Sequence, residues 1–306
     1  MGQLANEDTG QIIPLRARHL IGRSSRCDLQ IPVPVVSGEH ATLWWEGSHW
    51  CIKDLGSRNG TVIDGALLRP GEGRSLLEGA VIVFGAPKER WVLRSATPPL
   101  AQAVSEEDRS VCLATGELLA IPGPETPLVT VYRAPRGNWV LEDGDNEQPA
   151  RDGEVVSVDG RDWRLHLPEP NTGTLDLDAQ VRTLTTITLR MAHSLDEEHV
   201  EVSIGHNHQW AQLKTRAHHY LLLTLARQRV SDAADASLSP SAHGWVYQDE
   251  LLRMLGTDKN KLNVDIFRAR KQFADAGVEG AANIVERRAS TRQLRIGVGA
   301  LDIQRL

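Results

Sequence analysis

The period of the apolar residues constrains this fold most, and over the first third of the chain that period is two rather than 3.6. From Gln11 to about Arg94, short apolar runs such as "HATLWWE" and "AVIVFG" follow one another at hairpin spacing. Gly, Asn, Asp and Pro separate them, as the chemistry of tight turns requires. No helical period interrupts the series. The pattern therefore predicts an N-terminal all-β sandwich.

A second β-rich stretch follows. Residues 95–109 are rich in Pro, Ala and acidic residues and are typical of a linker, and apolar runs at strand spacing resume over 111–168. Within them "RGNWVLEDGD" echoes "GSHWCIKDLG" of the first stretch. We interpret the middle region as a β extension of the sandwich or as a degenerate second copy. It has no counterpart of the first region's "GRS" and "RNGT" turns, so we expect no binding chemistry from it.

After a second linker at 169–180, the period changes to that of helices. Two strand-like runs lead into three segments with helical spacing, 213–229, 245–256 and 260–277. Gly256 and Gly277 follow the second and third segments, where glycine commonly ends a helix. Residues 283–298 then read as a β-hairpin. We predict a multidomain chain with a sandwich at 1–97, a β-rich region at 105–170 and an α+β domain at 181–306.

Composition narrows the class of protein. Apolar residues make up 41 % of the chain, which is enough for ordinary cores, and no apolar run reaches membrane-spanning length. The N-terminal "MGQLANEDTGQ" lacks the features of a secretory signal. Cys27, Cys51 and Cys112 cannot all pair and show no metal-ligand spacing. We expect a cytoplasmic protein with reduced, buried thiols and no contact with a membrane.

Charge is distributed unevenly. The net charge is −6, and residues 1–173 carry 17 Lys/Arg against 24 Asp/Glu, a balance of −7. Residues 257–296 carry 9 against 5, a balance of +4. The whole chain is therefore no nonspecific nucleic-acid binder, but one C-terminal segment is basic enough to contact phosphates.

Three turns in the sandwich carry an unusual set of donors. They are Gly22-Arg23-Ser24, Ser37 with His40 three residues later, and Asn59-Gly60-Thr61. An arginine fork, a hydroxyl and backbone N–H groups suit a phosphate, which brings three acceptor oxygens. In this order the motifs resemble the forkhead-associated (FHA) domain, a β-sandwich that binds phosphothreonine peptides.

The resemblance, which covers residues 1 to about 95, implies a role for each motif residue. It assigns Arg23 and Ser37 to the phosphate, and Asn59 to the peptide main chain with Arg58 near flanking residues. It assigns a loop-supporting role to Gly22, His40, Gly60 and Thr61. The family often has a basic residue after the loop serine, where this chain has Gly38.

The C-terminal order of strands, three helices and an arginine-rich hairpin resembles the OmpR-type winged-helix DNA-binding domain. That similarity implies that 260–277 holds the recognition helix and that the hairpin is the wing. It implies contacts to double-stranded DNA from Lys261, Arg268, Lys271, Gln272, Arg288 and Arg292. For Arg287 and Arg295 the alternative to a DNA contact is that they stabilise the hairpin by pairing with Glu286 and its neighbours.

Other chemistries find little support. No GxxxxGK[ST] or GxSxG motif occurs, and no carboxylate pair stands out, so we expect no enzyme activity and no cofactor. His206 and His208 fall in an expected turn and His219 on a helix. Converging ligands are not expected there, so we predict no metal site.

The sequence thus predicts a bacterial signalling protein that binds a phosphothreonine-containing partner, a Ser/Thr kinase or its substrate, and regulates transcription through DNA. The alternative is an adaptor or scaffold whose C-terminal winged helix contacts proteins and not DNA. The identities of peptide, kinase and operator, the oligomeric state and the independence of 105–170 stay open.

Overall fold

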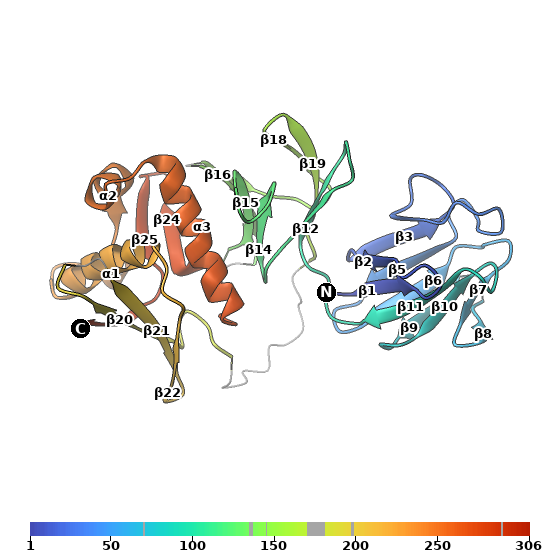
Figure 1. Cartoon of the computed structure of the whole chain (residues 1–306), viewed down its shortest axis with the longest axis horizontal. Coiled ribbons are helices and arrows are strands. Elements are labelled where there is room, and N and C mark those ends of the chain that lie inside the picture. Colours follow the sequence, from blue (N-terminus) through green and yellow to red (C-terminus); the bar gives the residue numbers. More distant parts are fainter. Residues whose placement is uncertain (70, 135–136, 145, 170–180, 197–198, 289) are drawn as a thin grey trace. The chain divides into compact units, whose positions relative to one another are not determined.

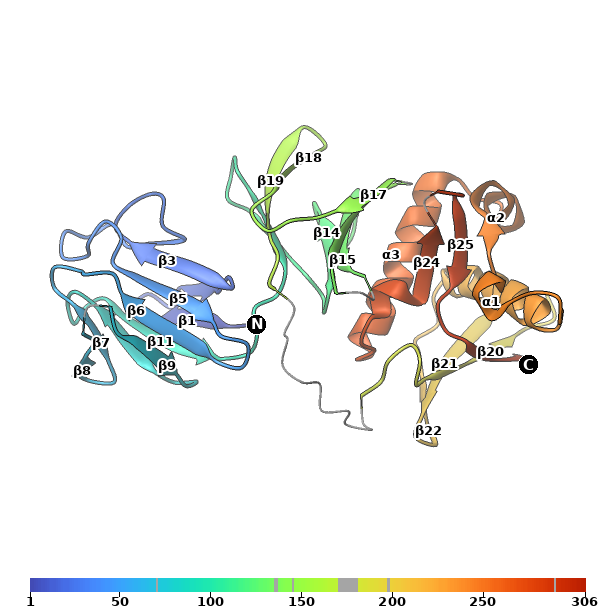
Figure 2. The same ribbon diagram turned by 180° about the vertical axis from the view of Figure 1, so that it is seen from behind.

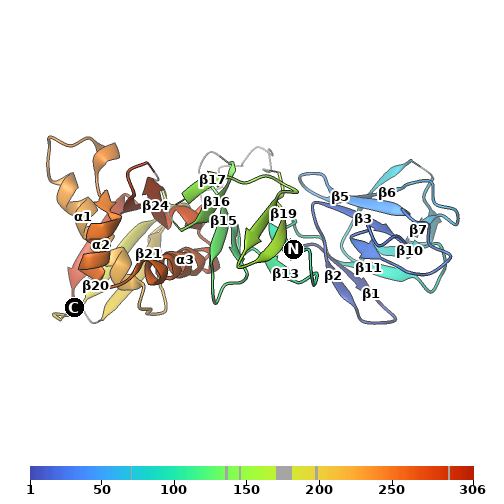
Figure 3. The same ribbon diagram turned by 90° about the horizontal axis from the view of Figure 1, so that it is seen from above.

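The computed structural model describes the chain except residues 70, 135–136, 145, 170–180, 197–198 and 289. It has two compact units, one of Met1–Leu100 with a short segment beginning at His166, and one of Ala101–Leu165 with the C-terminal part. Figure 1 labels the elements, and Figures 2 and 3 show the same ribbon from behind and from above. Among the described residues, no helix combines the length and apolar character needed to cross a bilayer.

The first unit is a sandwich of two sheets with the strand orders β2-β1-β11-β10-β7-β8 and β4-β3-β5-β6-β9. Its strands are β1 (Gln3–Asn6), β2 (Ile12–Pro14), β3 (Arg18–Gly22), β4 (Leu29–Gln30), β5 (Ala41–Trp45), β6 (Trp50–Asp54), β7 (Thr61–Ile63), β8 (Ala66–Leu67), β9 (Gly73–Leu76), β10 (Val81–Phe84) and β11 (Arg90–Ser95).

Alternation builds the core of this sandwich. Leu4, Ile21, Leu43, Ile52 and Phe84 come from different strands and are all completely buried. Because successive side chains of a strand point to opposite faces, the residues between them face outward. The predicted all-β architecture is present.

The expected strand series began at Gln11 and omitted two strands. β1 pairs with both β2 and β11, and β9 pairs with β6. Each has only four residues and little apolar content, so its own sequence predicts no strand. Backbone pairing with apolar neighbours supplies the order that local propensity does not.

The middle region forms two further sheets, with the orders β13-β12-β19-β18 and β14-β15-β16-β17. Their strands are β12 (Gln102–Ser105), β13 (Val111–Leu113), β14 (Leu118–Ile121), β15 (Val129–Arg133), β16 (Trp139–Asp143), β17 (Asn146–Pro149), β18 (Val155–Val158) and β19 (Arg161–His166).

These eight strands repeat the connectivity of the first unit. When β4, β7 and β8 are left out, the first unit's orders become β2-β1-β11-β10 and β3-β5-β6-β9. Each strand then has one counterpart in the middle region, at the same place in the chain order and in the same sheet.

The C-terminal part combines helices with two small sheets, ordered β22-β21-β20-β26 and β23-β25-β24. Its elements are β20 (Thr188–His193), β21 (Val200–His206), β22 (Gln209–Gln212), α1 (His219–Ala233), the 3₁₀ turn η1 (Pro240–Ala242), β23 (Val246–Tyr247), α2 (Gln248–Leu255), α3 (Lys259–Asp275), the 3₁₀ turn η2 (Ala281–Ile284), β24 (Val285–Arg288), β25 (Gln293–Ile296) and β26 (Ala300–Arg305).

The helices and hairpin fall where the sequence predicts them, with shifted boundaries. The first helical segment was expected from Leu213, but Leu213 continues the strand pairing by donating its N–H to Val202 O at 2.8 Å. The second was expected from Trp245, but Val246 and Tyr247 form β23 and pair with the hairpin strand β25. Tertiary pairing thus overrides the local helical period at both starts.

Candidate functional site

Three loops of the first unit meet at one rim, and backbone hydrogen bonds join the first two. Arg23 N donates to Ser37 O at 2.8 Å, and Ser24 N donates to Gly38 O at 3.0 Å. A Cβ at position 22 would stand 2.3 Å from Gly38 O, which no real Cβ tolerates. Gly22 therefore allows the two loops to approach, as expected of a loop-supporting residue.

His40 connects the second loop to the third. Its Nδ1 accepts from Ser37 N at 3.1 Å, and its Nε2 lies 3.1 Å from Gly60 O. The ring therefore accepts at one nitrogen and donates at the other, which only neutral imidazole can do. Burial lowers the pKa of this histidine and so favours the neutral form. His40 is completely buried, which fits support of the loops rather than ligand contact.

Asp54 organises the third loop from below. Its carboxylate accepts from Gly56 N and Ser57 N, both at 2.8 Å, and from the hydroxyls of Ser57 and Thr61, both at 2.7 Å. Burial acts to raise the pKa of Asp54, but these hydrogen bonds prevail and hold it below its ordinary value. The carboxylate thus stays charged and fixes the turn that carries Arg58 and Asn59.

The four predicted ligand-contacting residues gather on this rim. Ser37 Oγ accepts from Arg58 N at 3.0 Å, Asn59 Nδ2 donates to Val35 O at 2.7 Å, and Arg23 Nε donates to Val36 O at 3.2 Å. Arg23, Arg58 and Asn59 are exposed and Ser37 is half-buried. The rim presents guanidinium groups, a hydroxyl and an amide to solvent, a set of donors suited to an anionic group on a peptide.

Sequence reasoning missed Asp54, although a signal was present. An aspartate followed two residues later by glycine and then serine is the pattern of an Asx turn, in which the side chain accepts from the next backbone N–H groups. Gly85 was also missed. It has φ +75°, and a Cβ there would stand 2.4 Å from Val35 O, under the loop that carries Ser37.

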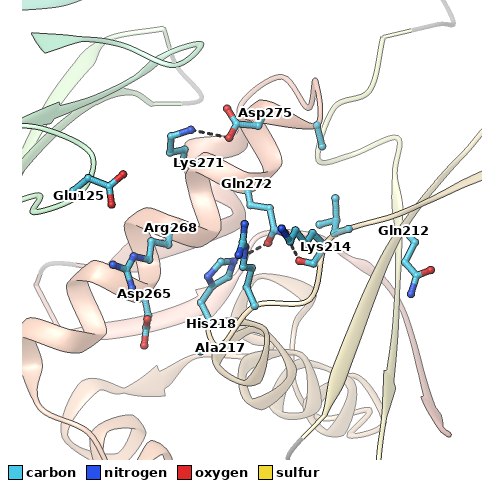
Figure 4. A pocket seen from close by; sticks show the side chains of 13 residues that line it. Glu125, Gln212, Lys214, Ala217, His218, Asp265, Arg268, Lys271, Gln272 and Asp275 are labelled. Carbon is cyan, nitrogen blue, oxygen red and sulfur yellow. Dashed lines mark hydrogen bonds and ion pairs between the residues drawn. The ribbon is translucent and has the colours of Figure 1, made fainter.

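The second set of predicted residues lies in the C-terminal part, where α3 and the residues before α1 line an open groove of about 710 Å³. Arg268, Lys271 and Gln272 reach it from α3 (Figure 4). Lys214 and Arg216, which sequence reasoning did not single out, line it from the segment before α1.

Gln272 is already engaged within this groove. Its Nε2 donates to Lys214 O at 2.7 Å, and its Oε1 lies 2.7 Å from His218 Nε2 (Figure 4). The same Oε1 lies 2.9 Å from His219 Nε2. The amide therefore ties α3 to the start of α1. Only a rearrangement would free it to contact a base.

The remaining cations of this set differ in their partners. Lys261 pairs with Asp265 at 2.6 Å and Lys271 with Asp275 at 2.7 Å, each one turn away on the same helix. Arg268 is exposed beside them. The helix thus presents a mixed rather than purely basic face.

Two arginines of the hairpin lie against one tryptophan. The guanidinium carbons of Arg288 and Arg295 lie 4.1 Å and 4.4 Å from the centroid of the Trp245 ring. Arg295 also pairs with Glu286 at 2.7 Å, the bracing role considered for it from sequence. Arg292 is exposed in the turn, at φ +51°.

One group of potential metal ligands occurs among the described residues, Glu46, His49 and Cys51. Cys51 Sγ lies 3.0 Å from Glu46 Oε2, and burial, with the adjacent carboxylate, raises the pKa of this thiol to about 11. At neutral pH the sulfur is thus a thiol that donates to the carboxylate. All three cysteines are free and buried, as predicted.

Comparison with known proteins identifies the first unit. Residues 19–85 match the FHA domain family, so the N-terminal sandwich contains an FHA domain. No curated protein matches this chain.

Among solved structures, the FhaA FHA domain complexed with the intracellular domain of Rv3910 is 27 % identical, covering 31 % of this chain and 100 % of that one (TM-score 0.28). Mycobacterium tuberculosis EmbR, in complex with a low-affinity phosphopeptide, is 24 % identical (TM-score 0.29). This match covers 32 % of the present chain and 25 % of EmbR. The FHA domain of an Arabidopsis thaliana hypothetical protein is 25 % identical, and the match covers 32 % of the present chain and 87 % of that domain (TM-score 0.29).

Proposed function

We propose that this chain is a phosphothreonine-dependent signalling protein whose FHA domain binds a phosphorylated partner protein at the rim of Arg23, Ser37 and Asn59. The partner is a Ser/Thr kinase or one of its substrates, and the setting is the bacterial cytoplasm. Arg23 and Ser37 hold the phosphate, Asn59 holds the peptide main chain, and Arg58 contacts flanking residues.

The observation that carries this proposal is the bonding among the three loops. Arg23 N donates to Ser37 O, Arg58 N donates to Ser37 Oγ, and His40 joins Ser37 to Gly60. Donors that lie far apart in sequence are therefore held beside one another before any ligand arrives. Such preorganisation lowers the entropy cost of binding.

The test compares a phosphothreonine peptide library with phosphoserine and unphosphorylated versions on the full chain. A charge-assisted hydrogen bond is worth about 1.5–3 kcal/mol, so Arg23→Ala should weaken capture of phosphothreonine peptides roughly 10- to 150-fold. Arg94→Ala, an exposed arginine on β11, is the matched control and should bind as the native chain does. Equal capture by Arg23→Ala and the native chain would remove the proposed site.

A second proposed activity is binding of double-stranded DNA by the C-terminal part, which would make the protein a transcription regulator. Its support is the winged-helix order of elements, with β23 between α1 and α2 pairing with the hairpin. Further support comes from the exposed cations Arg268 and Arg292. Lys214 and Arg216 in the groove add two phosphate partners that the sequence comparison did not assign.

Salt dependence distinguishes DNA binding from the rival adaptor role. Each phosphate contact contributes a slope of about −0.9 to the plot of log affinity against log salt, so replacing Arg268 and Arg292 by alanine should flatten it by about 2. A protein contact made by apolar groups should show no such slope. Failure to retain any genomic DNA fragment at low salt, by the native chain and by every variant that exposes α3, would leave the adaptor role.

A further inference from the structure

The middle sandwich has kept the strand order of the FHA domain but has lost its binding loops. The strands without counterparts are β4, β7 and β8, which adjoin the loops that carry Arg23 and Asn59 in the first unit. Even a turn is repeated, since Ser105 Oγ accepts from the N–H groups two and three residues later, as Asn6 Oδ1 does. The described part of this region is a second FHA-like copy that lacks counterparts of the turns carrying Arg23 and Asn59.

In place of loops, the middle sandwich makes contacts through one face of the sheet that contains β14 and β15. β14 and β15 are buried along almost their whole length, on both faces, whereas strands with one solvent-facing side alternate. One face fills the middle sandwich. On the other, Leu118, Ala120 and Tyr132 pack with Phe267 of α3 and Ala282 of η2. The sheet therefore covers one side of α3.

A buried charge cluster fixes this contact. Glu142 on β16 pairs with Arg270 of α3 at 3.0 Å and with Arg287 of β24 at 3.3 Å. The side chains are only 6 %, 1 % and 5 % exposed. Arg270 also lies over the Tyr132 ring, 4.7 Å from its centroid, and donates to Val285 O at 3.0 Å. Burial acts to lower the pKa of Arg270, but the charge of Glu142 prevails and raises it above its ordinary value, so the guanidinium stays charged.

The covered side of α3 is the one beside the hairpin. Arg287 Nη2 donates to Asn263 Oδ1 at 2.6 Å, which joins β24 to the first half of α3. Gly144, directly after β16, reaches the same place, because a Cβ on it would stand 3.6 Å from Lys259 and 3.9 Å from Asn263. In helix-turn-helix complexes the N-terminal residues of the recognition helix contact the base edges. A duplex in that position would collide with Gly144.

We propose that the outer face of the β14–β17 sheet is an intramolecular docking surface that competes with duplex DNA for α3 and β24. Glu142 takes the place of DNA phosphates for Arg270 and Arg287 in the closed form. The inference rests on the proposed DNA binding and adds its regulation, because any signal that lifts the sheet would raise DNA affinity by the same factor as it raises the open population.

The test measures opening and DNA binding separately, on the full chain. Ala120→Cys is a small change at a site only 4 % exposed, so its labelling by a thiol reagent reports opening of the sheet from α3. Peptide mapping separates it from the three native, buried cysteines. We expect a saturating 30-base-pair duplex to accelerate this labelling at least tenfold. DNA binding with unchanged labelling would overturn the proposal.

Glu142→Gln, made alone and with Ala120→Cys, provides the second arm. It should raise the labelling rate and the affinity for the same duplex by equal factors, whereas Glu106→Gln, an exposed acid paired with Arg164 elsewhere in this sandwich, should change neither. Faster labelling with unchanged or weaker DNA affinity would show that the sheet is a structural support and no competitor. Absence of DNA binding even by variants whose labelling shows them open would refute the DNA-binding function itself, and the regulation with it.

Discussion

Replacing Asp54 by asparagine should damage both the stability of the FHA domain and its binding rim. The substitution keeps the shape of the side chain but turns Oδ2 into an NH₂ donor facing the hydroxyls of Ser57 and Thr61. Thr61 is completely buried, so no water can replace the lost acceptor. Each of the two charge-assisted hydrogen bonds is worth about 1.5–3 kcal/mol. The hydroxyls regain part of this stabilisation by rotating to accept from the new NH₂ group. The free energy of unfolding should therefore fall by about 3 kcal/mol.

The assay is thermal unfolding of the full chain, followed by a titration with a phosphothreonine peptide. For a domain of this size about 3 kcal/mol lowers the midpoint of the first unit by roughly 12–24 °C. Peptide affinity should fall as well, because the turn that places Arg58 and Asn59 depends on Asp54. Asp8→Asn, an exposed acid in the same unit, should leave both measurements unchanged.

The pH dependence supplies an independent check. The pKa of Asp54 is held below its ordinary value, so its contribution to stability is present above the unfolded pKa of about 3.9 and is lost as pH falls through the lower folded value. The difference between native and Asp54→Asn chains should therefore shrink in acid. A variant with native midpoint and native peptide affinity at pH 7 would refute the assignment of Asp54 as the organiser of the loop.

Two further predictions follow from the structure. Gly85→Ala should lower the free energy of unfolding by more than about 1 kcal/mol and weaken peptide binding, because it adds a collision with Val35 O to the strain of positive φ. Gly10→Ala, at φ +71° with open space around it, is the control for the strain alone. Equal urea midpoints for the two variants would contradict the collision. Burial lowers the pKa of His218 to about 4 from 6.5, so the unfolded chain binds its proton first and stability falls as pH drops from 6.5 towards 4, by an amount on the order of 3 kcal/mol at the lower end. Urea unfolding of His218→Gln should show a shallower pH dependence over this range, and an unchanged one would show that His218 is not the group responsible.

The predictable part of the site is the part whose chemistry is local. Arg23, Ser37 and Asn59 lie in short turns between apolar strands, and turn residues at such places depend on neighbours only a few positions away. The same holds for the helices and the hairpin, whose periods and terminal glycines are written in consecutive residues. The sequence therefore located these elements with boundaries shifted by up to six residues, and it suggested the echo between the first and middle regions.

Only the tertiary structure decided which polar and charged groups already have partners from distant parts of the sequence. Arg270 and Glu142 are 128 residues apart, and the residues next to each in the sequence do not indicate that the two would pair. Gln272 reads as an exposed residue of a polar helix face, yet its amide is bonded to residues 53 to 58 positions earlier. A helical period shows which residues share a face, but the partner on that face is set by packing of the whole chain. For this reason the sequence alone located the loops that we propose to bind the phosphate, and the fold determined which side of α3 the middle sheet covers.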